Sequence, residues 1–130
     1  MPEASTSTQP FAALMGVEIL EQDKGRVVGR LTVREDLCTA GPILHGGAYM
    51  TFADTLGAVG AFLNLPAGAR TTTLESKTNF LGSAPVGEII TGEATPLHVG
   101  RRSSVWQTRI TNAAGKLLAQ VTQTQMTLEG

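Results

Sequence analysis

The stretch GPILHGGAYMTFADTLGAVGAFL, residues 41–63, decides how the rest of the chain is interpreted. A His-Gly-Gly sequence leads into a run that is long enough for a helix and apolar on nearly every side. A helix of this kind is a buried one. Gly57 and Gly60 lower its helix propensity, which indicates close packing at both positions. We therefore predict a buried helix over residues 47–63.

Asp54 lies in the middle of this run and, His45 aside, is the only charged residue between Leu37 and Ala69. Aspartate is a poor helix-interior residue and is costly to bury without a partner. It shares a narrow polar stripe with Thr51 and Thr55, where we expect a site. The alternative is a structural carboxylate that is satisfied by these threonines or by a distant arginine.

The remaining sequence predicts strands around this helix. FAALM (11–15) is typical of a short helix, and a hairpin over 17–33 turns at Asp23-Lys24-Gly25. Further strands are expected, separated by short loops, at 71–81, 88–99, 102–111 and 116–128. Pro96 marks an edge or a bulge. We expect an α+β fold in which a curved antiparallel sheet, ending in a meander, wraps a long central helix.

Composition limits the possible functions. The 130 residues fit one domain, expected over 11–130 after a disordered lead-in at 1–10. Charged residues make up 16%, below the usual ~25%, which suggests that another subunit covers part of the surface. A net charge of −1 gives no general attraction for nucleic acid or membranes. A single cysteine and the lack of a secretion signal favour the cytoplasm, and no metal-ligand spacing is present.

The His-Gly-Gly sequence can also act chemically, because the first N–H groups of a helix lack intrahelical partners and can hold an oxyanion. The alternative is a plain loop-to-helix junction with a packed His45. Gly47 and Asp54 are separated by about 10 Å along one helix, so one helix cannot present both to a single carbonyl. Two antiparallel helices can. A catalytic site would therefore require at least a two-fold dimer with two composite sites.

At HGGAYMTFADTLGAVGAF the sequence resembles the hotdog-fold acyl-CoA thioesterases, and in particular the subgroup of the phenylacetate-degradation and 4-hydroxybenzoyl-CoA thioesterases. The resemblance rests on an ordered set: H-G-G, a carboxylate nine residues after the histidine, TNFLGSAPVGE, HVGRR and NAAGKLLAQ. It implies a hotdog fold, dimers or tetramers with active sites between subunits, an acyl-CoA substrate and no cofactor. The reaction expected is hydrolysis to the free acid and coenzyme A.

The resemblance also implies roles for single residues. Asp54 would be the nucleophile or general base, the Gly47 N–H would polarise the thioester carbonyl, and His45 would fix that loop. Gly82, Ser83, Arg101 and Arg102 would lie near coenzyme A, although some relatives carry Arg-Pro in place of Gly82-Ser83. From spacing alone, Thr51 and Thr55 are further candidates for substrate binding. The expected pocket walls are Tyr49, Met50, Phe52, Leu56 and Phe80.

Two other functions remain open at this stage. One is an (R)-specific enoyl-CoA hydratase of the same fold, which uses an Asp followed by a His five residues later, whereas here the His precedes the Asp by nine. The other is a non-catalytic module that binds or senses acyl-CoA, which has no need of an unpaired buried acid. The sequence leaves open an aryl or a fatty acyl group, and coenzyme A or a carrier protein.

Overall fold

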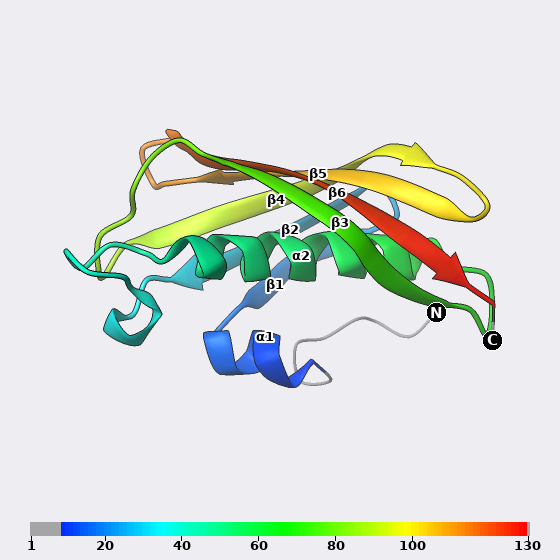
Figure 1. Ribbon diagram of the computed structural model, residues 1–130, viewed down its shortest axis with the longest axis horizontal. Coiled ribbons are helices and arrows are strands. Elements are labelled where there is room, and N and C mark those ends of the chain that lie inside the picture. The colour runs from blue at the N-terminus through cyan, green and yellow to red at the C-terminus, as the bar shows by residue number, and fades with distance from the viewer. Residues whose placement is uncertain (1–8, 130) are drawn as a thin grey trace.

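The computed structural model describes residues 9–129, in which a curved six-stranded sheet covers one long helix (Figure 1). The elements in chain order are α1 (Pro10–Met15), β1 (Glu18–Asp23), β2 (Arg26–Thr32), the 3-10 turn η2 (Glu35–Leu37), α2 (Gly46–Leu63), β3 (Arg70–Phe80), β4 (Ile89–Val99), β5 (Ser103–Thr111) and β6 (Leu117–Leu128). The predicted lead-in lies largely outside the described residues, but Pro10 already begins α1. Proline suits this first helical position because its missing N–H has no partner there.

The strand order is β1-β2-β4-β5-β6-β3, and every neighbouring pair is antiparallel. The predicted meander is correct for β4, β5 and β6 but wrong for β3, which pairs with β6 at the sheet edge. The reason is the connection 81–88, which crosses the end of the sheet. It is held to β6 by the Gly82 N–H, which donates to the Leu118 carbonyl (3.0 Å), and to the end of β2 by the Gly87 N–H, which donates to the Val33 carbonyl (2.8 Å).

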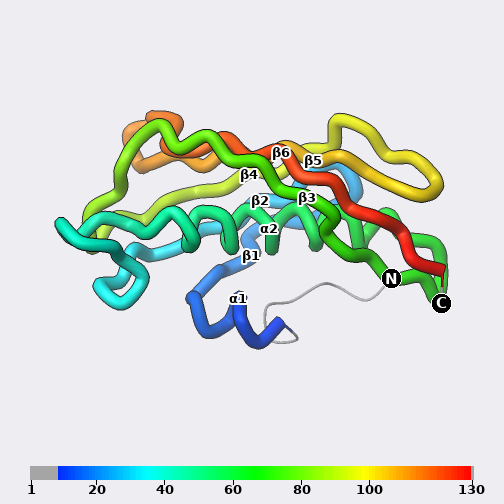
Figure 2. Tube along the Cα trace, in the orientation of Figure 1, coloured from blue at the N-terminus to red at the C-terminus, as the bar shows by residue number. Residues whose placement is uncertain are grey.

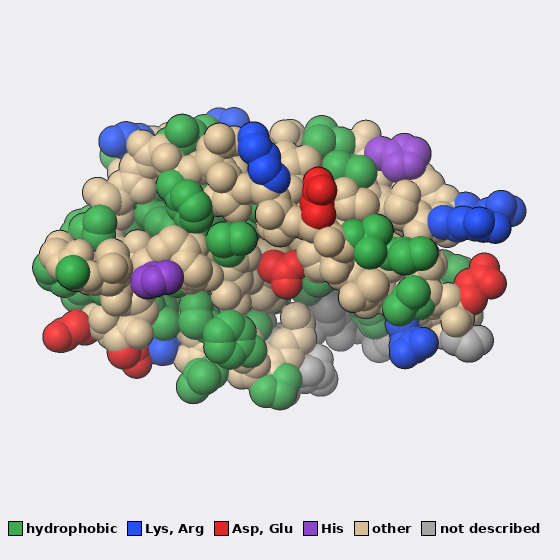
Figure 3. Space-filling view, viewed as in Figure 1, with side chains coloured by type: hydrophobic (Ala, Val, Ile, Leu, Met, Phe, Trp, Pro, Cys, Tyr) green, Lys and Arg blue, Asp and Glu red, His purple; other side chains and the backbone are tan. Residues whose placement is uncertain are grey.

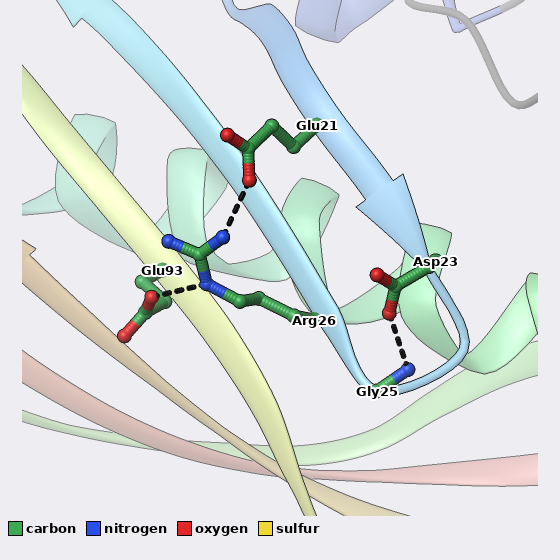
Figure 4. Close-up of polar contacts among 5 residues, drawn as sticks. All are labelled: Glu21, Asp23, Gly25, Arg26 and Glu93. Carbon is green, nitrogen blue, oxygen red and sulfur yellow. Dashed lines mark hydrogen bonds and ion pairs between the residues drawn. The ribbon is translucent and has the colours of Figure 1, made fainter.

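The hairpin β1–β2 turns as its sequence predicts. The Asp23 carboxylate accepts a hydrogen bond from the Gly25 N–H at 2.8 Å. Beside the turn, the Arg26 guanidinium reaches Glu21 on β1 and Glu93 on β4 (Figure 4). These groups are exposed and the ion pairs contribute little stability, but they link three consecutive strands on the outer face of the sheet.

The helix α2 lies in the concave face of the sheet and contacts all six strands (Figure 2). This approach depends on glycine. A Cβ at Gly29 or Gly92 would stand 2.7 or 2.6 Å from a methyl carbon of Leu56. On the helix itself, a Cβ at Gly60 would stand 2.5 Å from the Trp106 ring, and one at Gly57 would stand 2.3 Å from Gln123 Oε1. The close packing predicted at both helix glycines is confirmed.

Within residues 9–129, the strand β3 pairs with β6 on one side and with no strand on the other, so that its outer edge is free. A bulge between Thr73 and Glu75 interrupts its alternation. Without the bulge, Glu75 and Lys77 would follow Thr73 onto the face toward α2. With it, the less exposed side chains after the bulge are Ser76 and Thr78. A long free edge of this kind is a ready site for pairing with another strand.

The strand β4 bears out the expectation for Pro96. The pairing of β2 with β4 ends at Ala94, and the register of β4 against β5 shifts between Pro96 and His98. Proline is therefore tolerated, because no neighbour on that side needs its missing N–H. Among residues 9–129, no helix has the length and hydropathy needed to cross a membrane.

Candidate active site

The Asp54 carboxylate is held at the middle of α2 by two neighbouring strands. Its Oδ1 accepts hydrogen bonds from Thr73 Oγ1 on β3 (2.7 Å) and from Gln123 Nε2 on β6 (3.1 Å). Neither bond falls on Oδ2. A hollow of about 310 Å³ adjoins the carboxylate and is lined by Met50, Thr51, Asp54, Thr73 and Ser76. The acid thus has partners, but these are not the threonines or the arginine considered from the sequence.

Thr51 and Thr55 bond to the helix backbone instead. Thr51 Oγ1 donates to the Gly47 carbonyl (3.0 Å), and Thr55 Oγ1 donates to the Thr51 carbonyl (2.7 Å). Such bonds to the preceding turn satisfy hydroxyls within a helix. Thr51 still lines the hollow beside Asp54, whereas Thr55 is buried.

Around Asp54 the fold brings together three residues that no sequence pattern singled out, Thr73, Gln123 and Gln125. Gln123 and Gln125 on β6 are 0% and 1% exposed. Gln125 Nε2 donates to Thr73 Oγ1 at 2.6 Å, so that Gln125 and Asp54 are linked through Thr73. One signal in the sequence could have found the two glutamines. In AQVTQTQ (119–125), Gln123 and Gln125 continue the alternate positions of Ala119 and Val121, which are typical of the buried face of a strand.

At the N-terminus of α2, His45 is the N-cap residue, and its Nδ1 accepts a hydrogen bond from the Gly47 N–H at 2.8 Å. An accepting Nδ1 requires the neutral tautomer with its proton on Nε2. The His45 carbonyl accepts from the Ala48 N–H at 2.9 Å. Among the described residues the Gly46 N–H meets no acceptor, so it is the donor of this turn that stays open.

The two halves of the predicted site do not meet within one chain. The helix runs without a break from Gly46 to Leu63, which keeps Asp54 about 10 Å from Gly47. Both halves nevertheless lie along β3. Asp54 bonds to Thr73, and a Cβ added at Gly46 would stand 3.2 Å from the Phe80 ring.

The predicted contacts with coenzyme A fall at opposite ends of the sheet. Gly82 and Ser83 lie in the loop that bonds to Leu118, at the start of β6. The Arg102 carbonyl accepts from the Thr127 N–H near the end of the same strand (2.8 Å). Nine residues of β6 separate these two points, about 30 Å at ~3.4 Å per residue. One subunit therefore cannot bring both groups to one end of a substrate.

Arg101 and Arg102 share a hollow of about 380 Å³ with a third arginine, Arg70, at the start of β3. The other lining residues are Met126, Thr127, Leu128 and Glu129. Lys or Arg side chains project from this end of the molecule, at the right of Figure 3, and further charged groups of both signs lie near the middle of the same face. No local sequence pattern links Arg70 to the other two arginines, because its proximity to them depends on the pairing of β3 with β6.

The predicted pocket walls need correction. Phe52 and Leu56 are 0% exposed and Tyr49 is 2% exposed, so these three belong to the core. They were expected to face a pocket, but the sheet covers them. Burial, with a smaller effect of Glu88, raises the pKa of the Tyr49 phenol, which stays protonated and donates to the Gly82 carbonyl at 3.2 Å. Met50 does line the hollow beside Asp54, and Phe80 is exposed next to Gly46.

A third hollow, of about 330 Å³, opens between α1 and the first turns of α2. Its lining residues are Phe11, Met15, Asp36, Leu37, Cys38, His45, Gly47, Ala48 and Thr51. Thr51 lines this hollow and the one beside Asp54, so the two adjoin along α2. Within residues 9–129, no group of three His, Cys, Asp or Glu side chains is arranged to hold a metal ion.

A sheet wrapped around one long helix is the hotdog architecture, and comparison with known proteins agrees. Residues 41–119, more than half of the chain, match the thioesterase superfamily. The 1,4-dihydroxy-2-naphthoyl-CoA hydrolase of Listeria monocytogenes is 32% identical over 104 residues, which cover 80% of this chain and 84% of that protein.

Solved structures share the fold over nearly the whole chain. AziG of S. sahachiroi has a TM-score of 0.89 at 28% identity, and the aligned region covers 93% of this chain and 98% of the AziG chain. The PaaI protein of the E. coli phenylacetic acid degradation operon has a TM-score of 0.87 at 24% identity, with 93% and 86% covered. The chain therefore belongs to the thioesterase superfamily. The predicted class, an acyl-CoA thioesterase with the hotdog fold, is confirmed.

Proposed function

We propose that this thioesterase hydrolyses acyl-CoA at composite sites between two subunits, with Asp54 of one subunit facing the N-terminus of α2 of the other. The observation that carries the proposal is the Asp54 carboxylate itself. Two hydrogen bonds anchor its Oδ1, and a hollow for substrate adjoins it. The catalytic chemistry of a thioester hydrolase needs a carboxylate that is accessible as well as oriented.

One two-fold axis is compatible with both strand pairing and helix packing in the proposed dimer. If two β3 strands pair antiparallel at their free edges so that Phe80 of one faces Thr73 of the partner subunit, the two-fold axis passes between Ser76 and Lys77. If two α2 helices lie antiparallel with Gly46 opposite Asp54 of the partner subunit, the axis passes at Met50. Because Asp54 bonds to Thr73 and Gly46 lies against Phe80 within each chain, the two registers are linked. Met50 and Ser76 line the same hollow, so strand pairing and helix packing can share this axis.

Buried hydroxyls at this edge also fit pairing between subunits. Ser76 Oγ and Thr78 Oγ1 are buried and meet no hydrogen-bond partner among the described residues. Both belong to β3, whose outer edge is free within one chain. The β3 strand of a second subunit would pair with this edge. It would also cover part of the surface, as the low fraction of charged residues suggests.

We assign the oxyanion to the Gly46 N–H of the partner subunit. The sequence favoured the Gly47 N–H, which would first have to leave His45 Nδ1. The Gly46 N–H is the adjacent donor and needs no such exchange. His45 then serves as the cap that fixes the turn, and the positive end of the helix dipole adds to the stabilisation of negative charge.

The reaction follows from this arrangement. As a general base, Asp54 takes a proton from water, and the resulting hydroxide adds to the thioester carbonyl carbon. The Gly46 N–H stabilises the oxyanion, and collapse of the intermediate breaks the C–S bond and releases the thiolate, which takes up the proton. As a nucleophile, Asp54 would instead form a mixed anhydride that water hydrolyses. No metal or organic cofactor enters either scheme.

Coenzyme A would extend from this centre to the hollow of Arg70, Arg101 and Arg102, whose guanidinium groups suit phosphates. Gly82 and Ser83, at the opposite end of the sheet, would reach the same substrate only from the other subunit. The acyl group would enter the hollow between α1 and α2, whose apolar side chains come mainly from Phe11, Met15, Leu37 and Ala48. The 32%-identical relative acts on an aryl-CoA thioester by its name, and we propose the same class here.

Thiol release from aryl-, short-, medium- and long-chain acyl-CoA thioesters, measured for the wild type and for Asp54→Asn, tests the proposal. We expect turnover of aryl-CoA that falls at least ~10²-fold in the variant, as for loss of a general base. Near wild-type turnover by Asp54→Asn would refute the role of Asp54. Tight binding of acyl-CoA without turnover would instead identify a binding module.

A further inference from the structure

We propose that Thr73, Gln123 and Gln125 are positioning residues that fix Asp54 through Oδ1 and leave Oδ2 as the reacting oxygen. The proposal rests on the catalytic role proposed for Asp54. Gln123 and Gln125 do not line the hollow beside Asp54, so any effect of these two residues on the reaction would pass through the carboxylate. Thr73 does line that hollow, and its proposed role rests on its hydrogen bond to Oδ1.

The hydrogen bonds form a chain with one direction. Thr71 Oγ1 donates to Gln125 Oε1 (3.0 Å), Gln125 Nε2 donates to Thr73 Oγ1 (2.6 Å), and Thr73 Oγ1 donates to Asp54 Oδ1 (2.7 Å). The amide NH₂ of Gln125 can only donate, so Thr73 must use its single proton elsewhere. That proton is directed at Asp54. Each bond in such a chain polarises the next one.

The burial of the two glutamines indicates a function beyond packing. Earlier on the same face of β6, at alternate positions, stand the fully buried Ala119 and Val121. A buried amide is costly unless its groups are bonded, and Gln123 Oε1 meets no partner among the described residues. An apolar residue would avoid that cost. What Gln123 supplies in return is its Nε2 donor to Asp54 at 3.1 Å.

Two donors on one oxygen fix how the carboxylate is turned. Thr73 reaches Oδ1 from β3 and Gln123 reaches it from β6, so rotation about the bond to the carboxyl carbon would break both contacts. The remaining oxygen is then available to a water or a thioester carbon in the hollow beside Asp54. A misplacement of about 1 Å at such a group can cost about 10² in rate.

The test compares Thr73→Val with Thr73→Ser on one acyl-CoA substrate. Valine keeps the shape of the side chain and removes the hydrogen-bond donor. We expect kcat to fall about 10-fold or more while KM changes less than about twofold, because the orientation of Asp54 stabilises the transition state and not the bound substrate. Serine keeps the hydroxyl and should restore kcat. Thr108→Val is the matched control. The Thr108 hydroxyl is buried on β5 without a partner among the described residues, so its removal should leave kcat unchanged.

The outcomes separate this inference from the proposed function when Asp54→Asn is measured alongside. An active Asp54→Asn refutes the catalytic role itself. An inactive Asp54→Asn with a fully active Thr73→Val refutes positioning, as does an equal loss in Thr73→Ser and Thr73→Val. If Thr73→Val does not fold, Gln125→Met decides, because it removes the donor to Thr73 and the acceptor of Thr71 but leaves Thr73 and Asp54 in place. Unchanged kcat in Gln125→Met would overturn the chain, and a lowered kcat at constant KM would support it.

Discussion

Gly57 of α2 lies directly against Gln123 of β6, so that a methyl group at Gly57 would stand 2.3 Å from Oε1 and 2.8 Å from Nε2 of that glutamine. Alanine is a better helix former than glycine by about 1 kcal/mol. Even so, we expect Gly57→Ala to lower kcat about 10-fold, because the methyl displaces the amide that orients Asp54. Steady-state kinetics with acyl-CoA measure the effect. Gly60→Ala is the control: its methyl would press on the Trp106 ring, which should cost about 1–3 kcal/mol in urea unfolding and leave kcat of the folded protein unchanged.

The N-terminus of α2 allows one N–H to be removed with little disturbance. Gly46 is the first helical residue, where proline is favoured, and His45 at φ −65° and ψ 140° already has the conformation preferred before proline. We expect Gly46→Pro to lower kcat by about 10²–10³, the loss typical of one oxyanion donor. Gly46→Ala adds a Cβ against Phe80 but keeps the N–H. Similar kinetics for the two variants would exclude this N–H as the oxyanion donor.

Composite sites predict that two inactive variants restore each other. In a mixed dimer of Asp54→Asn and Gly46→Pro subunits, one site carries both substitutions and the other carries neither. Random exchange of equal amounts should return about a quarter of the wild-type activity, given two sites per dimer. Activity is measured after mixing and subunit exchange, beside each variant alone. Mixtures as inactive as their components, despite exchange seen by native mass spectrometry, would show that each site belongs to one chain.

Arg70 at the start of β3, and Arg101 and Arg102 in the β4–β5 turn, lead us to predict that this hollow recognises the nucleotide of coenzyme A. We expect Arg70→Gln and Arg102→Gln to raise KM about 5- to 10-fold with little change in kcat, the pattern for binding that does not change in the transition state. A thioester of 3′-dephospho-coenzyme A shows whether the 3′-phosphate is the group bound. Arg109→Gln removes an exposed charge outside this hollow. If Arg109→Gln raises KM as much as the other two variants do, the increase in KM reflects net charge only and not binding in this hollow.

Phe11 on α1 lines the hollow in which we propose that the acyl group binds. Phe11→Ala should lower kcat/KM for aryl and longer acyl-CoA thioesters about 10-fold, because apolar contact in the hollow is lost. Acetyl-CoA is too short to reach that contact, so its hydrolysis should not change. Leu14 on the same helix is 69% exposed and does not line the hollow. A selectivity profile that shifts equally in Leu14→Ala would argue against this acyl site.

The sequence was sufficient for features that depend on local signals. The helix α2, its glycine contacts and the prominence of Asp54 all follow from one apolar run with a single acid. The placement of β3 was not accessible in this way, because its partner β6 lies some forty residues further on and the loop that carries the chain across the sheet shows no periodicity. Thr73, Gln123 and Gln125 were missed for the same reason, since their meeting at Asp54 is a matter of strand register.

The strand order also sets the order in which the molecule can form. The hairpins β1–β2, β4–β5 and β5–β6 close over short turns, but Thr32 pairs with Ile89, and Phe80 pairs with Ala119. Such distant pairings are slow because a long loop must close before any contact is gained. Asp54 acquires both Thr73 and Gln123 only when β3 and β6 have each docked on α2. During refolding, enzymatic activity should therefore return after most of the secondary structure has formed.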